Sequence, residues 1–178
     1  MRYISFVILY IFLICNLSYA SNEVSLSKEG LKTCIISNGT PNHEIGKFPN
    51  KGNPHSFKAQ KLKYCFPTNP IKNTFVNNKA KTVGITLTGI PIRPGTADWY
   101  DASSPRKHSR DKSSGWNLEA ITPNGNVFGI DQNNAHVDNK GLYHYHGMPD
   151  KLHNFDGNSL VGYAADGHEI HYLGLKRT

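Results

Sequence analysis

Three of the nine histidines in this chain lie close together, on either side of a short turn signal. His136 precedes the turn, and His144 and His146 follow it. Between them, residues 138–141 have Asp at the first turn position and Gly at the fourth. This pattern is typical of a type I turn followed by a glycine in the left-handed region. The segment therefore predicts a β-hairpin with a three-residue loop.

The length of the loop decides which side chains share a face of the hairpin. A three-residue loop pairs Asp138 with Leu142, Val137 with Tyr143, His136 with His144, Ala135 with Tyr145 and Asn134 with His146. Because side chains alternate between the two faces of a strand, the three histidines would share one face with Asn134. A loop of two or four residues would split them between the faces. The three-residue loop is favoured because it places Gly141 where a positive φ is needed.

Three imidazoles on one face of a hairpin suit a metal ion. Directly opposed Cβ atoms lie about 5 Å apart, and neutral imidazole is a good ligand for Zn, Cu, Ni and Fe. Three His with one open coordination position is the pattern of a catalytic zinc site or a copper site. We expect His136, His144 and His146 to bind one divalent transition metal, Zn or Cu. The alternative is a hydrogen-bonded network of His and Tyr, which would leave many imidazole donors to satisfy.

Further groups are needed to complete or orient such a site. A ligating His normally donates its other N–H to a carboxylate or a carbonyl. The candidate carboxylates are Asp131, Asp138, Glu119 and Asp166. The candidates for a further ligand are His43, His108, His168 and His171.

The N-terminus has the features of a secretory signal. Met1-Arg2 is followed by an apolar run over about residues 4–15 and by small residues up to Ala20. We interpret residues 1–20 as a signal peptide cut after Ala20, with a membrane anchor as the alternative. The apolar run is short for a membrane span, and no later stretch is apolar enough. The predicted location is secreted, either extracellular or periplasmic.

Two cysteines remain after this segment is removed. The mature chain would then contain two cysteines, Cys34 and Cys65. An even number of cysteines in an oxidising compartment predicts a disulfide between them. Two free buried thiols are the alternative.

The charge of the chain narrows the range of partners. The formal net charge is +7. The basic residues are scattered along the sequence, however, and the protein is predicted to be located outside the cell. Nucleic acid is therefore not expected, and an anionic surface or a glycan is the more sensible electrostatic partner.

Short apolar patterns separated by Gly, Pro and Asn predict the fold. Candidate strands are found at residues 34–36, 57–66, 82–88, 160–164 and 169–173, in addition to the hairpin. In 82–88, Val83, Ile85 and Leu87 alternate with Thr and Gly, so one buried and one polar face are expected. Residues 38–54 and the charged stretch 96–114 are interpreted as long loops. We predict an all-β single domain over residues 21–178, a sandwich or distorted barrel of short strands with long loops.

Several segments resemble the YHYH protein family, named for Tyr143-His144-Tyr145-His146. The similarity extends over most of residues 35–170. It includes Asn38-Gly39, Pro41-Asn42-His43, Gly84-Ile85, Gly89-Ile90-Pro91, Gly115-Trp116-Asn117, Ala135-His136 and Ala165-Asp166-Gly167. The resemblance implies a secreted, β-rich domain and no particular mechanism. Family members often extend past the Asp-Gly turn, so the chain is expected to be a short member or a fragment lacking a C-terminal extension. Among the further groups, His43 and Asp166 are favoured because they lie in these segments.

Three functions are compatible with these residues. The first is a secreted module that sequesters, senses or delivers Zn or Cu. The second is a metal-dependent enzyme, a hydrolase or copper oxidase, in which Glu119 or Asp166 is the general base. The third is a glycan-binding module that uses Trp99, Tyr100 and Trp116, which requires these rings to be exposed.

Overall fold

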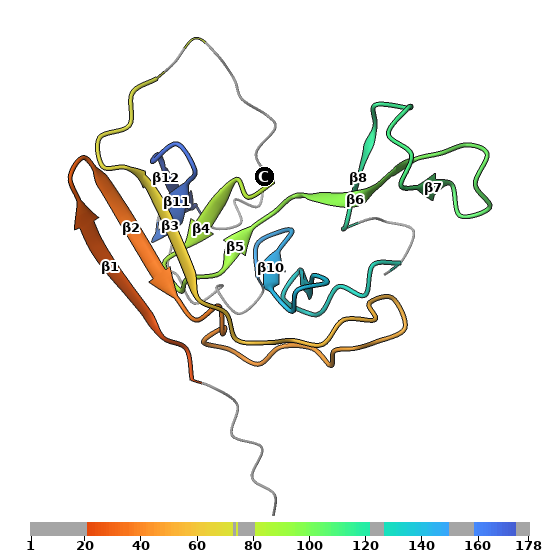
Figure 1. The fold of residues 1–178 in the computed structure, drawn as a ribbon, viewed down its shortest axis with the longest axis horizontal. Helices are drawn as coiled ribbons and strands as arrows, with labels where there is room; N and C mark the ends of the chain where they lie inside the picture. The colour runs from red at the N-terminus through yellow and green to blue at the C-terminus, as the bar shows by residue number, and fades with distance from the viewer. Residues whose placement is uncertain (1–20, 73, 75–80, 122–126, 150–158, 174–178) are drawn as a thin grey trace, which may run out of the picture.

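The computed structural model describes residues 21–72, 74, 81–121, 127–149 and 159–173. Within these ranges the chain forms strands β1 to β12 in three sheets, with no helix (Figure 1). The all-β prediction is confirmed, and none of the three sheets closes into a barrel. No membrane-spanning helix is found in this part of the chain. The predicted signal peptide, residues 1–20, lies outside the described residues.

The first sheet is an antiparallel meander of β1, β2 and β3, covering Val24–Glu29, Lys32–Ser37 and Leu62–Pro67. Its last two strands place Cys34 directly opposite Cys65. The two sulfur atoms form the predicted disulfide, with an S–S distance of 2.04 Å. The covalent bond therefore joins neighbouring strands of one sheet across the long connection between them.

The six-stranded sheet has the order β12-β11-β4-β5-β10-β9. In chain order its strands are β4 (Gly84–Thr86), β5 (Pro91–Ile92), β9 (Ala135–Val137), β10 (Tyr143–Tyr145), β11 (Ser159–Ala164) and β12 (Glu169–Tyr172). Strand β5 runs parallel to β10, and the other neighbours pair antiparallel. This sheet brings the predicted hairpin, β9 and β10, beside the end of β5.

The prediction of one buried and one polar face for residues 82–88 was wrong. Strand β4 lies between two neighbours, and its three residues are all buried, whereas Val83 is exposed. The hydroxyl of Thr86 is satisfied inside the protein, since it accepts a hydrogen bond from the Ile90 amide at 3.0 Å. A central strand can therefore bury a threonine on the face that alternation marks as polar.

The interpretation of residues 96–114 as one long loop was wrong for 96–100 and 108–109, which are strands, whereas 101–107 and 110–114 are irregular as expected. Strands β6 (Gly95–Tyr100), β7 (His108–Ser109) and β8 (Asn117–Glu119) form a three-stranded antiparallel ribbon in the order β7-β6-β8. The ribbon extends away from the other two sheets (Figure 1). Cross-strand polar contacts hold it together in place of a buried apolar face, which is why hydrophobic periodicity did not reveal it.

The main core lies against the apolar side of the β9–β10 hairpin. It consists of Ile90, Ala135, Val137, Tyr143 and Tyr145, each no more than 1% exposed. Ile45, Phe48 and Phe57, from the long connection between β2 and β3, pack against it. The predicted loop at 38–54 is confirmed as irregular, and it covers the core beneath the hairpin.

Candidate metal centre

The hairpin has the predicted register. Tyr143 pairs with Val137, His144 with His136, and Tyr145 with Ala135. The amide of Asp138 donates to the carbonyl of Leu142 at 3.0 Å, and Gly141 has a φ of 87°. The three-residue loop is therefore confirmed, and alternation places the three histidines on one face.

The imidazoles of His136, His144 and His146 form a nearly equilateral triangle. Their ring centroids are 4.7 to 4.8 Å apart in all three pairs. His144 and His146 are buried, with 4% and 8% of their surface exposed, and His136 is half-buried. One candidate ligand atom from each ring lies within 4.8 Å of the others. The three residues are therefore close enough to hold a single metal ion.

Backbone carbonyls orient all three rings. The Nδ1 atom of His136 lies 2.8 Å from the carbonyl oxygen of Phe128. That of His144 lies 3.1 Å from the carbonyl of Leu142, and that of His146 lies 3.2 Å from the carbonyl of Pro94. A carbonyl oxygen can only accept, so each Nδ1 carries the proton and donates it. Each Nε2 is consequently the nitrogen with a free lone pair, the form that binds a metal.

Two of these lone pairs face each other at short range. The Nε2 atoms of His136 and His146 are 3.1 Å apart. With both Nδ1 atoms protonated, neither Nε2 has a proton to donate to the other. If one ring carried its proton on Nε2 instead, its Nδ1 could no longer donate a hydrogen bond to the backbone carbonyl. A shared cation would resolve the conflict, since ligand nitrogens of a tetrahedral zinc site are about 3.3 Å apart if Zn–N is about 2.05 Å.

The protein environment keeps these imidazoles uncharged. Burial lowers the pKa of His144 to about 2, and the neighbouring charges of His136 and His146 act in the same direction. Burial, followed by the charge of His136, lowers the pKa of His146 to about 4. Burial also lowers the pKa of His136. All three rings are therefore in the neutral state that metal ligation requires.

Two groups that act on the cluster, Arg93 and His55, were not selected from the sequence. Arg93 is buried, and its charge further lowers the pKa values of His144 and His146. Its guanidinium donates to Asp138 at 2.8 Å. His55 acts on the pKa of His136 in the same direction. The only sequence signal for Arg93 is its position after Pro91–Ile92, and the parallel pairing of β5 with β10 that brings it close was not predictable.

Asp131 and His43 lie against the opposite side of the hairpin. The hydroxyl of Tyr143 donates to Asp131 at 2.7 Å, and burial raises the pKa of that tyrosine. Nε2 of His43 lies 2.6 Å from the hydroxyl of Tyr145, whose pKa burial also raises. Both candidates thus bond tyrosines of the apolar face instead of joining the three imidazoles.

The remaining sequence candidates lie elsewhere. Glu119 is exposed on β8, and Asp166 is exposed in the turn before β12. His108 is buried in the ribbon with Nδ1 3.1 Å from Asp98. His168 and His171 are exposed, and Nε2 of His171 lies 2.7 Å from Glu169. Of the candidate carboxylates, Asp138 and Asp131 act on the cluster, since the charge of each raises the pKa of His136.

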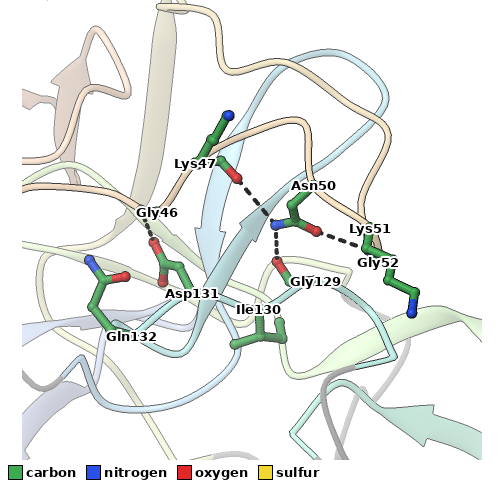
Figure 2. A pocket seen from close by; sticks show the side chains of 9 residues that line it. All are labelled: Gly46, Lys47, Asn50, Lys51, Gly52, Gly129, Ile130, Asp131 and Gln132. Carbon is green, nitrogen blue, oxygen red and sulfur yellow. Dashed lines mark hydrogen bonds between the residues drawn. The ribbon is translucent and has the colours of Figure 1, made fainter.

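A shallow cleft of about 470 Å³ lies between residues 46–52 and 129–132. Figure 2 shows Asn50 donating to the carbonyls of Lys47 and Gly129, and Asp131 accepting from the amide of Gly46. None of the three clustered histidines lines this cleft. Hydrogen bonds between the two loops occupy its polar groups. The cleft is therefore the boundary between two packed loops and is separate from the imidazole cluster.

Comparison with known proteins identifies the family. A search of curated proteins and a search of solved structures each found no match. A scan against protein families matched residues 63–175 to the family described as YHYH protein. The matched range includes the whole hairpin and all three clustered histidines, and it covers more than half of the sequence. The chain therefore belongs to the YHYH protein family.

Proposed function

We propose that this protein is a secreted domain that binds one Zn or Cu ion through Nε2 of His136, His144 and His146. The observation that carries the proposal is the 3.1 Å separation of two Nε2 atoms whose rings both donate from Nδ1 to carbonyls. That arrangement is unfavourable without a cation and close to the ligand spacing of a bound one.

The ligand set supports a borderline transition metal. Three neutral imidazoles suit Zn and Cu better than Ca or Mg, which prefer oxygen ligands. Metal binding would add electrostatic stabilisation to a cluster whose rings are already oriented, so little ordering would be needed. The buried core beneath β9 and β10 supports the same conclusion, because it makes the backbone under the ligands rigid.

A binding role is favoured over a catalytic one by the surroundings of the cluster. Two carboxylates, Asp138 and Asp131, act on the pKa of His136, and both are engaged in other bonds. Asp138 is bonded to Arg93 and to the amides of Lys140 and Leu142. Asp131 accepts from the hydroxyl of Tyr143 and from the amides of Gly46 and Asn133. A carboxylate engaged in this way is a poor general base. Glu119 and Asp166, the bases considered from the sequence, are exposed elsewhere.

The secreted location is supported by two observations. The cross-strand disulfide is typical of oxidising compartments. The first residues of the chain have the charge and apolar pattern of a secretory signal.

The test is metal uptake by protein purified without a polyhistidine tag. Elemental analysis should find Zn or Cu at about one ion per chain, and calorimetry on the stripped protein should show one saturable site. Absence of saturable uptake of either metal would leave a hydrogen-bonded imidazole network as the better account.

A further inference from the structure

The β7-β6-β8 ribbon has an aromatic face that the metal centre does not use. Trp99 pairs with Asn117, and the Tyr100 amide donates to the carbonyl of Trp116 at 2.8 Å. Tyr100 therefore lies opposite Trp116, and their side chains share one face of the ribbon. We call these two residues the aromatic platform.

The platform is open to solvent. Trp116 is 74% exposed and Tyr100 is 46% exposed. Trp99, on the opposite face, is less exposed and has the ammonium of Lys112 5.8 Å from its ring centroid. Tyr100 and Trp116, which are neighbours on one face, are thus the two most exposed of the three aromatics selected from the sequence.

Polar contacts make the ribbon beneath the platform rigid. The Asn117 side chain donates to the carbonyls of Thr96 and Asp98 at 3.0 and 2.9 Å. A Cβ on Gly95 would overlap the Asn117 side-chain oxygen, so the two strands fit closely here. Asp98 is bonded to Arg110 at 2.9 Å and to His108 at 3.1 Å, which joins β7 to β6. A platform held in this way loses little entropy when a ligand stacks on it.

The size of the platform argues against a protein partner. The exposed parts of the two rings amount to roughly 250–300 Å² if each ring offers about 200–250 Å² in full. A stable protein interface buries about 800 Å² on each side. The platform is therefore large enough for a small number of flat rings and too small for a second protein or a second copy of this chain.

The charge of the ribbon argues against a polyanion. Residues 95–119 contain four basic and four acidic residues: Arg106, Lys107, Arg110, Lys112, Asp98, Asp101, Asp111 and Glu119. The net charge of +7 is thus located outside this part of the chain. The expectation of an anionic partner, drawn from the total charge, does not apply to the platform.

We propose that the aromatic platform binds a neutral β-linked polysaccharide by stacking Tyr100 and Trp116 on its pyranose rings. The C–H groups on the faces of such sugars are apolar, while their hydroxyls point outward in the ring plane. Directly opposed side chains lie about 5 Å apart, on the scale of one pyranose ring. Arg110 comes two residues after His108, the β7 partner of Tyr100. Its Nε is paired with Asp98, and the other nitrogens of its largely exposed guanidinium can donate to sugar hydroxyls.

The test is retention of the purified protein by microcrystalline cellulose and by chitin, with heparin resin as the polyanionic comparison. Wild-type protein should be retained by at least one of the neutral polysaccharides. Trp116→Ala and Tyr100→Ala should each weaken that binding at least about tenfold. Trp116→Phe keeps a stacking surface and should retain most of it. Leu31→Ala is the control, because Leu31 is an 88% exposed apolar side chain in the turn between β1 and β2.

The inference is overturned if wild-type protein binds neither neutral polysaccharide, or if the Tyr100→Ala, Trp116→Ala double variant is retained as well as wild type. It is also overturned if light scattering shows a wild-type dimer that Trp116→Ala converts to a monomer. Zn uptake by the platform variants and retention after metal removal should both be unchanged. These two measurements separate failure of the platform from failure of the metal centre.

Discussion

The imidazole of His144 has the most demanding environment of the three candidate ligands. It is 4% exposed, and its neighbours disfavour its protonated form. Replacing it by alanine removes one ligand and leaves a buried space among the others. We expect His144→Ala to abolish stoichiometric Zn or Cu binding, measured by calorimetry on stripped protein.

Two variants serve as controls for that result. His171→Ala removes an exposed imidazole on β12 and should leave the stoichiometry unchanged. Tyr143→Phe removes the hydroxyl bonded to Asp131 on the other side of the hairpin. It should reduce stability by about 1–3 kcal/mol without reducing the number of ions bound. Equal loss of binding in Tyr143→Phe would contradict the division of the hairpin into two faces.

The lowered pKa values predict how the metal-free protein responds to acid. His146 has a pKa of about 4 and His144 of about 2 in the folded protein, against about 6.5 when unfolded. Between the folded and unfolded values the unfolded chain binds more protons, so stability falls as pH falls below about 6.5. Each of the two histidines contributes up to about 1.4 kcal/mol per pH unit in its window. Urea unfolding with a chelator present should show this slope, and a flat profile between pH 7.5 and 5 would refute it.

The same pKa values change the expected pH dependence of metal binding. Free imidazole ligands would lose metal as pH falls through about 6.5. In this cluster His144 and His146 remain neutral well below that value. Binding should therefore persist to a lower pH than it does for a peptide containing residues 134–147, which is the comparison to measure.

The turn of the hairpin is the element on which the register depends. Gly141 has a φ of 87°, and a Cβ there would lie 2.8 Å from Cβ of Lys58. Gly30 also has a positive φ but has nothing within 4 Å. Alanine is strained at a positive φ, so both Gly141→Ala and Gly30→Ala should lower the free energy of unfolding by about 1–2 kcal/mol. Gly141→Ala should lose at least about 1 kcal/mol more and bind metal more weakly. Equal losses in thermal unfolding would show that the contact with Lys58 is unimportant.

Strands could be predicted from the sequence where a recognisable turn and an alternating pattern of side chains indicate the same register. The hairpin is the clearest example, because Asp138 and Gly141 determine a register that alternation converts into a shared face for three histidines. The ribbon was not predictable, since β6 has no apolar alternation and depends on contacts such as Asn117 with Asp98. The proximity of Arg93 to the cluster also required a parallel pairing between strands distant in sequence.

At the scale of the whole molecule, the disulfide restricts the unfolded chain. Cys34 and Cys65 are 31 residues apart and enclose the long connection that covers the core. On the entropic model, closing a loop of this length contributes roughly 3–4 kcal/mol. The Cys34→Ser, Cys65→Ser double variant should lose about that much stability in urea unfolding. Reductant should destabilise wild type by a similar amount and leave the double variant unaffected.

The proposed export of the protein has a direct test. If residues 1–20 are a cleaved signal, the exported protein should begin at Ser21, which N-terminal sequencing can determine. Ser21 itself is tied to the domain, because the side chain of Asn38 donates to its carbonyl at 2.7 Å. An exported protein beginning at Met1 would refute the assignment.

The carbonyl anchors of the three imidazoles have a consequence for how the site is encoded. A carbonyl is present at every residue, so the groups that orient the rings at Phe128, Leu142 and Pro94 leave no trace of residue type in the sequence. Around the rings only the ligands themselves require a particular residue type, and the turn that sets their register requires Gly141. A change such as Phe128→Leu, which keeps the backbone path, should therefore preserve ring orientation. A complete, oriented site can thus be specified by very few positions. A motif as short as Tyr-His-Tyr-His can mark a centre that also depends on His136, on the nearby carbonyl of Phe128 and on the distant carbonyl of Pro94.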